Sequence, residues 1–93
     1  MPVTVYIPTP FRRATSNRDR VEVRSRDVAA ALDELESTYG ALRGLVRDEQ
    51  GEVHRHIAIY VNSEAIDALD GLNTPLRDGD EVAIIPALAG GRC

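Results

Sequence analysis

The stretch Glu81-Val82-Ala83-Ile84-Ile85-Pro86 runs directly into Ala87-Leu88-Ala89-Gly90-Gly91-Arg92-Cys93. The apolar run predicts a strand. The residues after it predict a tail, because two adjacent glycines have no side chain to pack and lose much backbone entropy when they are ordered. We therefore expect a folded domain over residues 1–86 and a flexible tail over residues 87–93. Such a thin tail can enter a narrow channel of another protein and bring a carboxylate to a reactive centre. The alternative is a frayed terminus, where small residues collect without a function.

Length and composition describe one small domain. With 93 residues the chain can build a single core, and 43% hydrophobic with 28% charged residues is the composition of an ordinary globular protein. No apolar run approaches the roughly 20 residues that span a bilayer. Residues 1–5 have no basic region followed by an apolar stretch, so no secretory signal is expected. These features predict a cytoplasmic protein that does not act at a membrane.

Charge is unevenly distributed along the sequence. The formal net charge of −4 argues against a nucleic-acid binder, which needs a basic surface to neutralise phosphates. The single cysteine is Cys93, so an internal disulfide is excluded, in agreement with a reducing compartment. The sequence has no lysine, which rules out self-conjugation through a lysine side chain. Basic residues gather in the first third of the chain: Arg12, Arg13, Arg18, Arg20, Arg24 and Arg26.

Two segments with a period of two predict the first strands. Val3, Val5 and Ile7 alternate with more polar residues, which indicates a half-buried strand over residues 2–8 that prolines close. Val21 and Val23 alternate with charged residues and predict a second strand with one solvated face. The two strands are expected to pair as a hairpin across a polar, turn-like connection.

From Asp27 the apolar period becomes helical. Asp27 is a good N-cap for the helix, and Gly40 is well placed to end it in a left-handed conformation. A short further turn is expected within residues 41–46. The apolar stripe consists of Val28, Ala31, Leu32, Leu35, Tyr39 and Leu42.

Two more strands follow the helix. Ile57, Ile59 and Val61 alternate and predict a third strand, which a turn over residues 62–64 ends. Asp78-Gly79 is a strong turn signal before the final strand over residues 81–86. The order of elements predicts an α+β fold of the β-grasp (ubiquitin-like) type, in which one long helix packs on one face of a small mixed sheet.

The alternation also sorts side chains between the two faces of this sheet. If the last strand runs parallel to the first, the face toward the helix carries Val3, Val5, Ile7, Val21, Val23, Ile59, Val61, Val82 and Ile84. The open face then carries Tyr6, Ala58, Tyr60, Ala83 and Ile85. Apolar residues gathered on a solvated face can mark a partner surface. Tyr6, Ala58, Tyr60 and Ile85 are our candidates for it, although isolated exposed apolar residues are normal.

Three other groups of side chains are candidate sites. His54 and His56, two apart, would present both imidazoles on one face of a strand and could bind a metal, or they could simply contact loop carbonyls. Asp78 and Asp80 could be paired acids, but their setting around Gly79 fits a turn better. The early arginines could bind an acidic partner or a phosphate, or form a solvated face.

The segment Leu76-Arg77-Asp78-Gly79-Asp80-Glu81-Val82-Ala83-Ile84-Ile85-Pro86-Ala87-Leu88-Ala89-Gly90-Gly91 resembles the C-terminal signature of the ubiquitin-like sulfur carriers, the MoaD and ThiS group. An acidic turn, an apolar strand, a proline and Gly-Gly follow one another in that family's order. The helix from Asp27 and the strand at residues 57–62 also fall where the family places them. Within the group, residues 54–62 and 86–91 most resemble carriers that serve a cysteine synthase, and the small subunit of molybdopterin synthase is second.

The resemblance implies a carrier that is not an enzyme and binds no cofactor of its own. An E1-like enzyme would use ATP and magnesium to adenylate the Gly91 carboxylate, and a sulfur donor would displace AMP to leave a thiocarboxylate. Leu88, Ala89 and Gly90 would give the tail access to the partner's active site. The sulfur would pass to a PLP-dependent cysteine synthase, with the large subunit of molybdopterin synthase or a thiamine pathway as alternative acceptors.

The sequence departs from the family pattern beyond Gly91. Arg92 and Cys93 follow, so the Gly91 carbonyl is part of a peptide bond. Related carriers with such extensions resemble precursors that a JAMM-type zinc metalloprotease trims, and we expect removal of Arg92 and Cys93 to activate this chain. An engineered terminus and a thiol role for Cys93 are the competing interpretations.

Two other functions remain open from the sequence. A ubiquitin-like protein modifier would join the same activated Gly91 to amines of other proteins. A β-grasp binding module with an inert tail would keep its function without residues 90–93.

Overall fold

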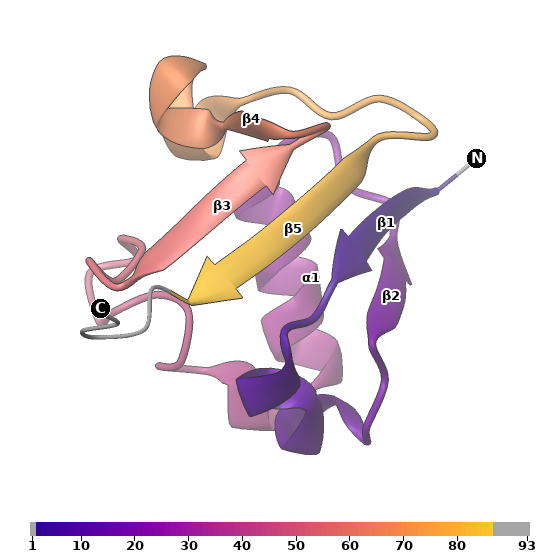
Figure 1. The fold of residues 1–93 in the computed structure, drawn as a ribbon, viewed down its shortest axis with the longest axis vertical. Helices are drawn as coiled ribbons and strands as arrows, with labels where there is room; N and C mark the ends of the chain where they lie inside the picture. Colours follow the sequence, from indigo (N-terminus) through magenta and orange to yellow (C-terminus); the bar gives the residue numbers. More distant parts are fainter. Residues whose placement is uncertain (1, 87–93) are drawn as a thin grey trace.

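The computed structural model describes residues 2–86, and its centre is a mixed sheet with one long helix across one face (Figure 1). The sheet has five strands in the order β2-β1-β5-β3-β4. The strands are β1 (Val3–Tyr6), β2 (Arg20–Val23), β3 (Ile57–Val61), β4 (Glu64–Ala65) and β5 (Glu81–Pro86). The helix is α1 (Val28–Thr38). This arrangement confirms the predicted β-grasp fold.

The first and last strands lie side by side in the middle of the sheet. β1 and β5 are parallel, with Val5 opposite Val82, and the Thr4 N–H donates to the Asp80 carbonyl at 3.0 Å. On the outer side of β1, β2 pairs antiparallel with Val21 opposite Val5. On the other side of β5, β3 pairs antiparallel. The predicted hairpin and the predicted parallel pairing are both confirmed.

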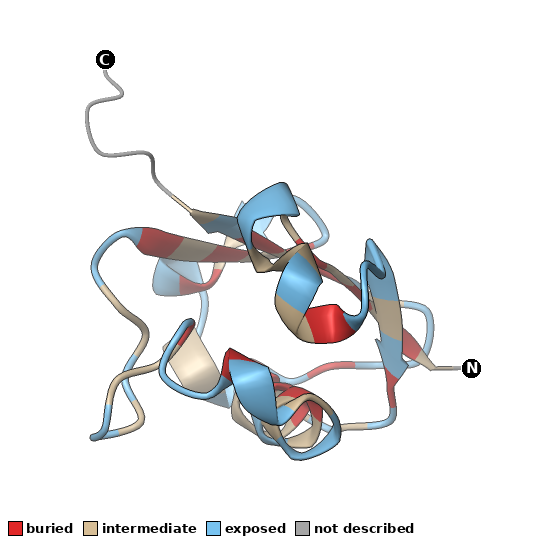
Figure 2. Cartoon of the chain, turned by 90° about the horizontal axis from the view of Figure 1, so that it is seen from below, coloured by how far each residue is buried: buried red, intermediate tan, exposed pale blue. Residues whose placement is uncertain are grey.

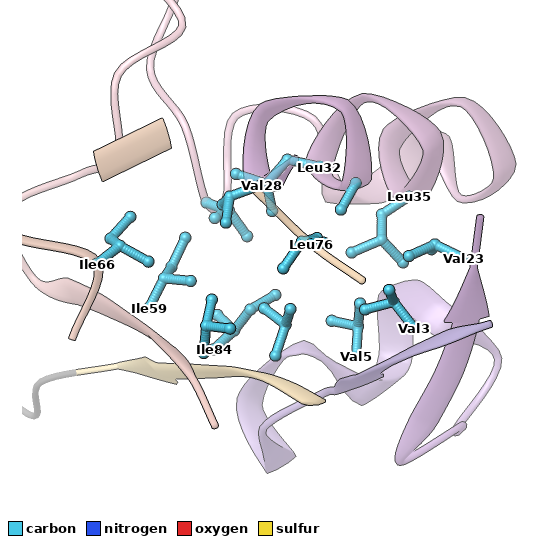
Figure 3. Close-up of a cluster of buried hydrophobic side chains, with 14 of the residues drawn as sticks. Val3, Val5, Val23, Val28, Leu32, Leu35, Ile59, Ile66, Leu76 and Ile84 are labelled. Atoms are coloured by element: carbon cyan, nitrogen blue, oxygen red, sulfur yellow. The ribbon is translucent and has the colours of Figure 1, made fainter. Parts of the chain in front are cut away.

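The core lies between the sheet and α1, where the buried residues in Figure 2 are found on both layers. Leu32 and Leu35 of α1 are each 1% exposed and lie over the valines and isoleucines of the sheet (Figure 3). Of the side chains predicted to face the helix, Val21 alone is only partly buried, and it lines a groove between β2 and the C-terminal part of α1. The others form the core as expected.

The N-terminus of α1 matches the prediction and its C-terminus does not. The Asp27 carboxylate accepts a hydrogen bond from the Ala30 N–H at 2.8 Å and caps the helix. The helix ends at Thr38, its C-cap is Tyr39 with φ −123°, and Gly40 does not adopt a left-handed conformation. Gly40 instead begins the short 3-10 helix η2 (Gly40–Leu42), which carries Leu42 into the core. The predicted left-handed cap at Gly40 is therefore wrong, because the chain continues there into a 3-10 helix.

Two turns, one after β3 and one before β5, lie at the end of the sheet away from Pro86. Asn62 (φ 50°) and Ser63 (φ 74°) join β3 to β4 in a two-residue hairpin with both residues left-handed, which is the type I′ geometry that fits strand twist. Gly79 has φ +89° and confirms the predicted turn before β5. The short strand β4 was not predicted, because two residues are too few for a periodic signal.

The connections contain further 3-10 helices. The segment expected to be a polar turn between the first strands contains η1 (Thr9–Thr15), whose Phe11 packs partly buried against the core. η3 (Ile66–Ala68) and η4 (Gly71–Asn73) follow β4. Within residues 2–86, no helix combines the length and the apolar character needed to cross a membrane.

Because Leu32 is buried at the centre of the core, Leu32→Ala is expected to lower the free energy of unfolding by about 3 kcal/mol through lost apolar burial and a cavity. Denaturant unfolding measures this change. Ser37→Ala, at an exposed position of the same helix, is the matched control and should change stability by less than about 0.5 kcal/mol. Equal losses in the two variants would contradict the packing described here.

Candidate functional site

The residues predicted to carry the chemistry lie outside the described part of the chain. These are Leu88, Ala89, Gly90, Gly91, Arg92 and Cys93. The structure does describe the strand that leads to them. β5 ends at Pro86, which lies opposite Ile57 at the start of β3. The site is therefore built from the residues around the end of β5.

β5 is a firmly held base for whatever follows it. It is bonded on both sides, by β1 and by β3, and is the central strand of the sheet. Val82 and Ile84 are 0% and 2% exposed and anchor its inner face. Pulling β5 out of place would break two ladders and expose the core, so the position of its last residue, Pro86, is fixed.

The open face of the sheet brings the candidate partner surface together. Tyr6 and Tyr60 both lie opposite Ala83, one on each neighbouring strand. Ala58 lies opposite Ile85 in the next row toward the end of β5. The small Ala83 side chain between two tyrosines leaves a shallow hollow of about 320 Å³, lined by Tyr6, Tyr60, Ser63, Glu81, Ala83 and Ile85.

Ile85 is the most exposed member of this open-face group. Its side chain is 47% exposed, whereas the two tyrosines and Ala58 are partly buried by their neighbours. An exposed isoleucine beside two aromatic rings loses ordered water when covered, which favours association. The alternation of the strands predicted the grouping, but the hollow depends on cross-strand register, which the sequence does not specify.

Asp80 holds the opposite end of β5 and takes no catalytic position. Its carboxylate accepts from the Arg77 N–H at 2.8 Å and from the Asn62 side-chain amide at 2.9 Å. Asn62 in turn accepts from the Glu81 N–H at 3.0 Å. The hydrogen bond from the Arg77 backbone, and next that from Asn62, hold the pKa of the Asp80 carboxyl below its usual value. Asp80 therefore ties the turn before β5 to the turn after β3, as the turn interpretation expected.

The two histidines lie just before β3, in a turn and not in the strand that the metal hypothesis assumed. Their rings stack with centroids 5.3 Å apart, and His54 Nε2 lies 2.8 Å from the Gly44 carbonyl oxygen. Residues 2–86 contain no group of three or more His, Cys, Asp or Glu side chains that could hold a metal. The structure thus agrees with the loop-carbonyl interpretation of His54.

Arg47 has a structural role that the sequence did not reveal. Its guanidinium bonds both Glu36 oxygens at 3.0 Å and Asp33 at 2.6 Å, and so ties the loop before β3 to α1. The hydrogen bond to Glu36 is the main reason why the pKa of Arg47 is raised. The partners are eleven and fourteen residues away in sequence, a separation with no local signal.

Of the early arginines, Arg18 and Arg20 line one groove together with Glu22 and Glu34, so the charge there is mixed. Arg12 donates from Nε to the Ile7 carbonyl at 3.2 Å and so supports η1. Arg13, Arg18 and Arg20 are exposed. This arrangement favours the solvated-face interpretation for Arg13 and Arg18, and Arg20 lies on the edge strand β2.

Comparison with known proteins gives consistent matches. The model of the ThiS family matches residues 5–91. The sulfur carrier protein CysO of Mycobacterium tuberculosis is 39% identical over 93 residues, covering 98% of this chain and 100% of that protein.

Solved structures agree with the sequence matches. A chain in the crystal structure of the Amycolatopsis orientalis BexX/CysO complex superposes with a TM-score of 0.89 at 37% identity, covering 96% of this chain and 99% of that one. The small archaeal modifier protein 1 of Methanosarcina acetivorans, solved in solution, gives a TM-score of 0.83 at 30% identity, with 96% and 95% coverage.

The Asp80 contacts predict a pH-dependent stability. Asp80→Ala should lower the free energy of unfolding by about 1 kcal/mol at pH 7, because two hydrogen bonds to a partly exposed carboxylate are lost. A carboxyl with a lowered folded-state pKa contributes fully above its unfolded pKa of about 4 and loses that contribution as pH falls further. Denaturant unfolding along an acid series should therefore show the two proteins converging in stability. Asp67→Ala, at an exposed position, is the control, and a difference that stays constant with pH would contradict this role.

Proposed function

The chain belongs to the ThiS family and is a sulfur carrier protein, not an enzyme, and on this basis we propose that its Gly91 carboxylate carries the sulfur as a thiocarboxylate. The observation that carries the proposal is that the family match runs to Gly91, through the central strand β5 and the residues after it. The folded domain of residues 2–86 supplies a rigid base, and residues 87–91 supply reach. A fully extended chain covers about 3.3 Å per residue, so the reach of five residues beyond Pro86 has an upper limit of roughly 16 Å.

The chemistry requires an activated carboxylate, because a carboxylate has no usable leaving group. A Gly91 oxygen would attack the α-phosphorus of ATP, bound with magnesium by an E1-like enzyme, and release pyrophosphate. Hydrosulfide, HS⁻, would then attack the acyl carbon, expel AMP and lose its proton, leaving a thiocarboxylate. Gly90, Ala89 and Leu88 let the terminus reach the reacting atoms, which the partner positions. The carrier contributes position and no catalytic side chain.

Activation depends on cleavage of the Gly91–Arg92 bond. The family match ends at Gly91, so Arg92 and Cys93 lie beyond the matched region, which supports trimming. A JAMM-type zinc metalloprotease is the proposed agent. Until it acts, the Gly91 carbonyl carbon bears an amide nitrogen and cannot be adenylated.

Cysteine biosynthesis is the pathway that we propose. The resemblance of residues 54–62 and 86–91 to carriers that serve a cysteine synthase supports delivery of sulfur to a PLP-dependent cysteine synthase, and the full-length similarity to the sulfur carrier protein CysO supports the carrier role. Molybdopterin synthase, through its large subunit, is the second candidate acceptor, followed by a thiamine pathway. The similarity to a small archaeal modifier protein gives specific support to a third role, conjugation of Gly91 to amines of other proteins.

We also propose that Tyr6, Ala58, Tyr60 and Ile85 form the surface that docks the activating enzyme. These four residues share the open face, and Ile85 directly precedes Pro86, the last described residue. A partner seated here would receive the tail without moving the sheet.

Intact mass measurement of the untagged protein from its own cells, with and without alkylation, tests trimming and carriage together. We expect a species that ends at Gly91 and is heavier by the difference between one sulfur and one oxygen atom. Higher-mass protein conjugates without any thiocarboxylate would favour the modifier role. Retention of Arg92 and Cys93 in every molecule during growth on limiting sulfur would contradict the processing proposal.

Ile85→Glu tests the docking surface. A buried carboxylate at the centre of the contact is costly, so adenylation by the activating enzyme at subsaturating carrier should fall by at least about tenfold. Leu69→Glu is the matched control, since Leu69 is also exposed, at 37% against 47% for Ile85, but lies beyond β4. Both variants are assayed in the form ending at Gly91, with folding checked by thermal unfolding. Equal activity of the two variants would exclude the open face as the docking surface.

A further inference from the structure

The edge strand β2 turns unpaired backbone groups outward. Thr4 directs its N–H toward β5, so Val3 and Val5 direct theirs toward β2, where they pair with Val23 and Val21. It follows that Arg20 and Glu22 of β2 turn their N–H and C=O groups to the free edge. Within residues 2–86 no other segment bonds to the Glu22 backbone, and the free edge closes only at Arg24, whose N–H donates to Glu34 at 3.0 Å.

The free edge is physically accessible. A groove of about 480 Å³ runs beside it, bounded by β2 and the C-terminal part of α1, with Val21, Leu35 and Tyr39 among its lining residues. An exposed edge with free backbone groups is a template for another strand. Edge strands normally avoid such pairing by being short and by carrying charged side chains. The charges on β2 therefore decide which second strand could pair with it.

The charges on β2 alternate in sign on one face. Val21 and Val23 face the helix, so Arg20 and Glu22 project on the open side of the sheet. Both are exposed, and neither has a salt-bridge partner in the described part of the chain. The strand therefore offers one positive and one negative group, two residues apart, along the same free edge.

This pattern is complementary to itself in one antiparallel register. With Val21 on a two-fold axis, Arg20 of one copy lies opposite Glu22 of the other, and each such pair exchanges two backbone hydrogen bonds. Registers centred on Glu22 or on Arg20 place like charges opposite each other, which is destabilising. We propose that the β2 edge is a self-association surface, through which a second copy of this chain adds its own β2 and joins the two sheets.

The pairing would be weak and would leave the carrier's other surfaces free. Interfaces between short strands bury little area, and contacts below about 1,200 Å² are transient, so we expect a dissociation constant of about 0.1–1 mM. The two open faces would lie on the same side of the joined sheet, uncovered. Self-association through β2 therefore does not depend on sulfur carriage.

Charge reversal with rescue tests the register. In a Cys93→Ser background, which removes disulfide-linked dimers, sedimentation velocity over a concentration series should show self-association. Arg20→Glu and Glu22→Arg should each weaken it by about tenfold, because each places like charges opposite each other. The double variant Arg20→Glu with Glu22→Arg restores both opposite-charge pairs and should recover the original association.

Thermal unfolding of each variant separates misfolding from lost pairing. A chain that is monomeric up to about 1 mM would overturn the proposal. So would a double variant that associates no better than the single ones, or association that survives both single reversals.

A cysteine at the two-fold axis gives a second readout. Val21 would face itself in a non-hydrogen-bonded pair with Cα atoms about 4.5 Å apart, which a disulfide can span. Val21→Cys in the Cys93→Ser background should form a covalent dimer on mild oxidation. Glu64→Cys, on the opposite edge strand β4, is the control and should stay monomeric. Equal cross-linking at both edges would overturn the assignment to β2.

Discussion

The structure depends on the parallel pairing of β1 with β5. These strands come from opposite ends of the described chain, and each forms an antiparallel ladder with one further strand, β2 or β3. Without the central ladder the sheet would separate into a two-stranded part, β2-β1, and a three-stranded part, β5-β3-β4, neither of which could cover α1. Val5 and Val82 lie opposite each other and are each 0% exposed, so the pairing also forms the middle of the core.

The two ends of the central strand β5 are held by different contacts. At its start, Asp80 and Asn62 bind the neighbouring turns together through side-chain hydrogen bonds. At its end, Pro86 lies opposite Ile57, so β5 is paired with β3 up to its last residue. The start of β5 is thus held by side-chain hydrogen bonds, and its end is held by the ladder with β3. A carrier needs this combination, since a tail is useful to a partner only when its base is in a constant place.

Much of the fold could be predicted because the relevant signals are local. Alternation at residues 3–7 and 57–61 reflects a strand with one buried face, and Asp27 caps α1 through a contact only three residues away. The remaining features depend on contacts between distant segments. The burial of Leu42 in η2 decides that Gly40 does not cap α1, and Arg47 finds its partners on α1 only after folding. Alternation along each strand also predicted which residues lie on the open face. Which of them are neighbours across strands depends on the register of pairing, which the sequence does not specify.

The central position of β5 also sets an order of events during synthesis. A growing chain can make β1, α1 and β3 early, but β1 and β3 have no common neighbour until residues 81–86 have left the ribosome. Long-range parallel pairing is slow to form and is lost in incomplete chains. A chain released before this strand would expose its apolar surfaces and be open to proteases. Completion of the fold therefore requires the strand that directly precedes residues 87–93, so a chain released before β5 is made cannot complete the sheet.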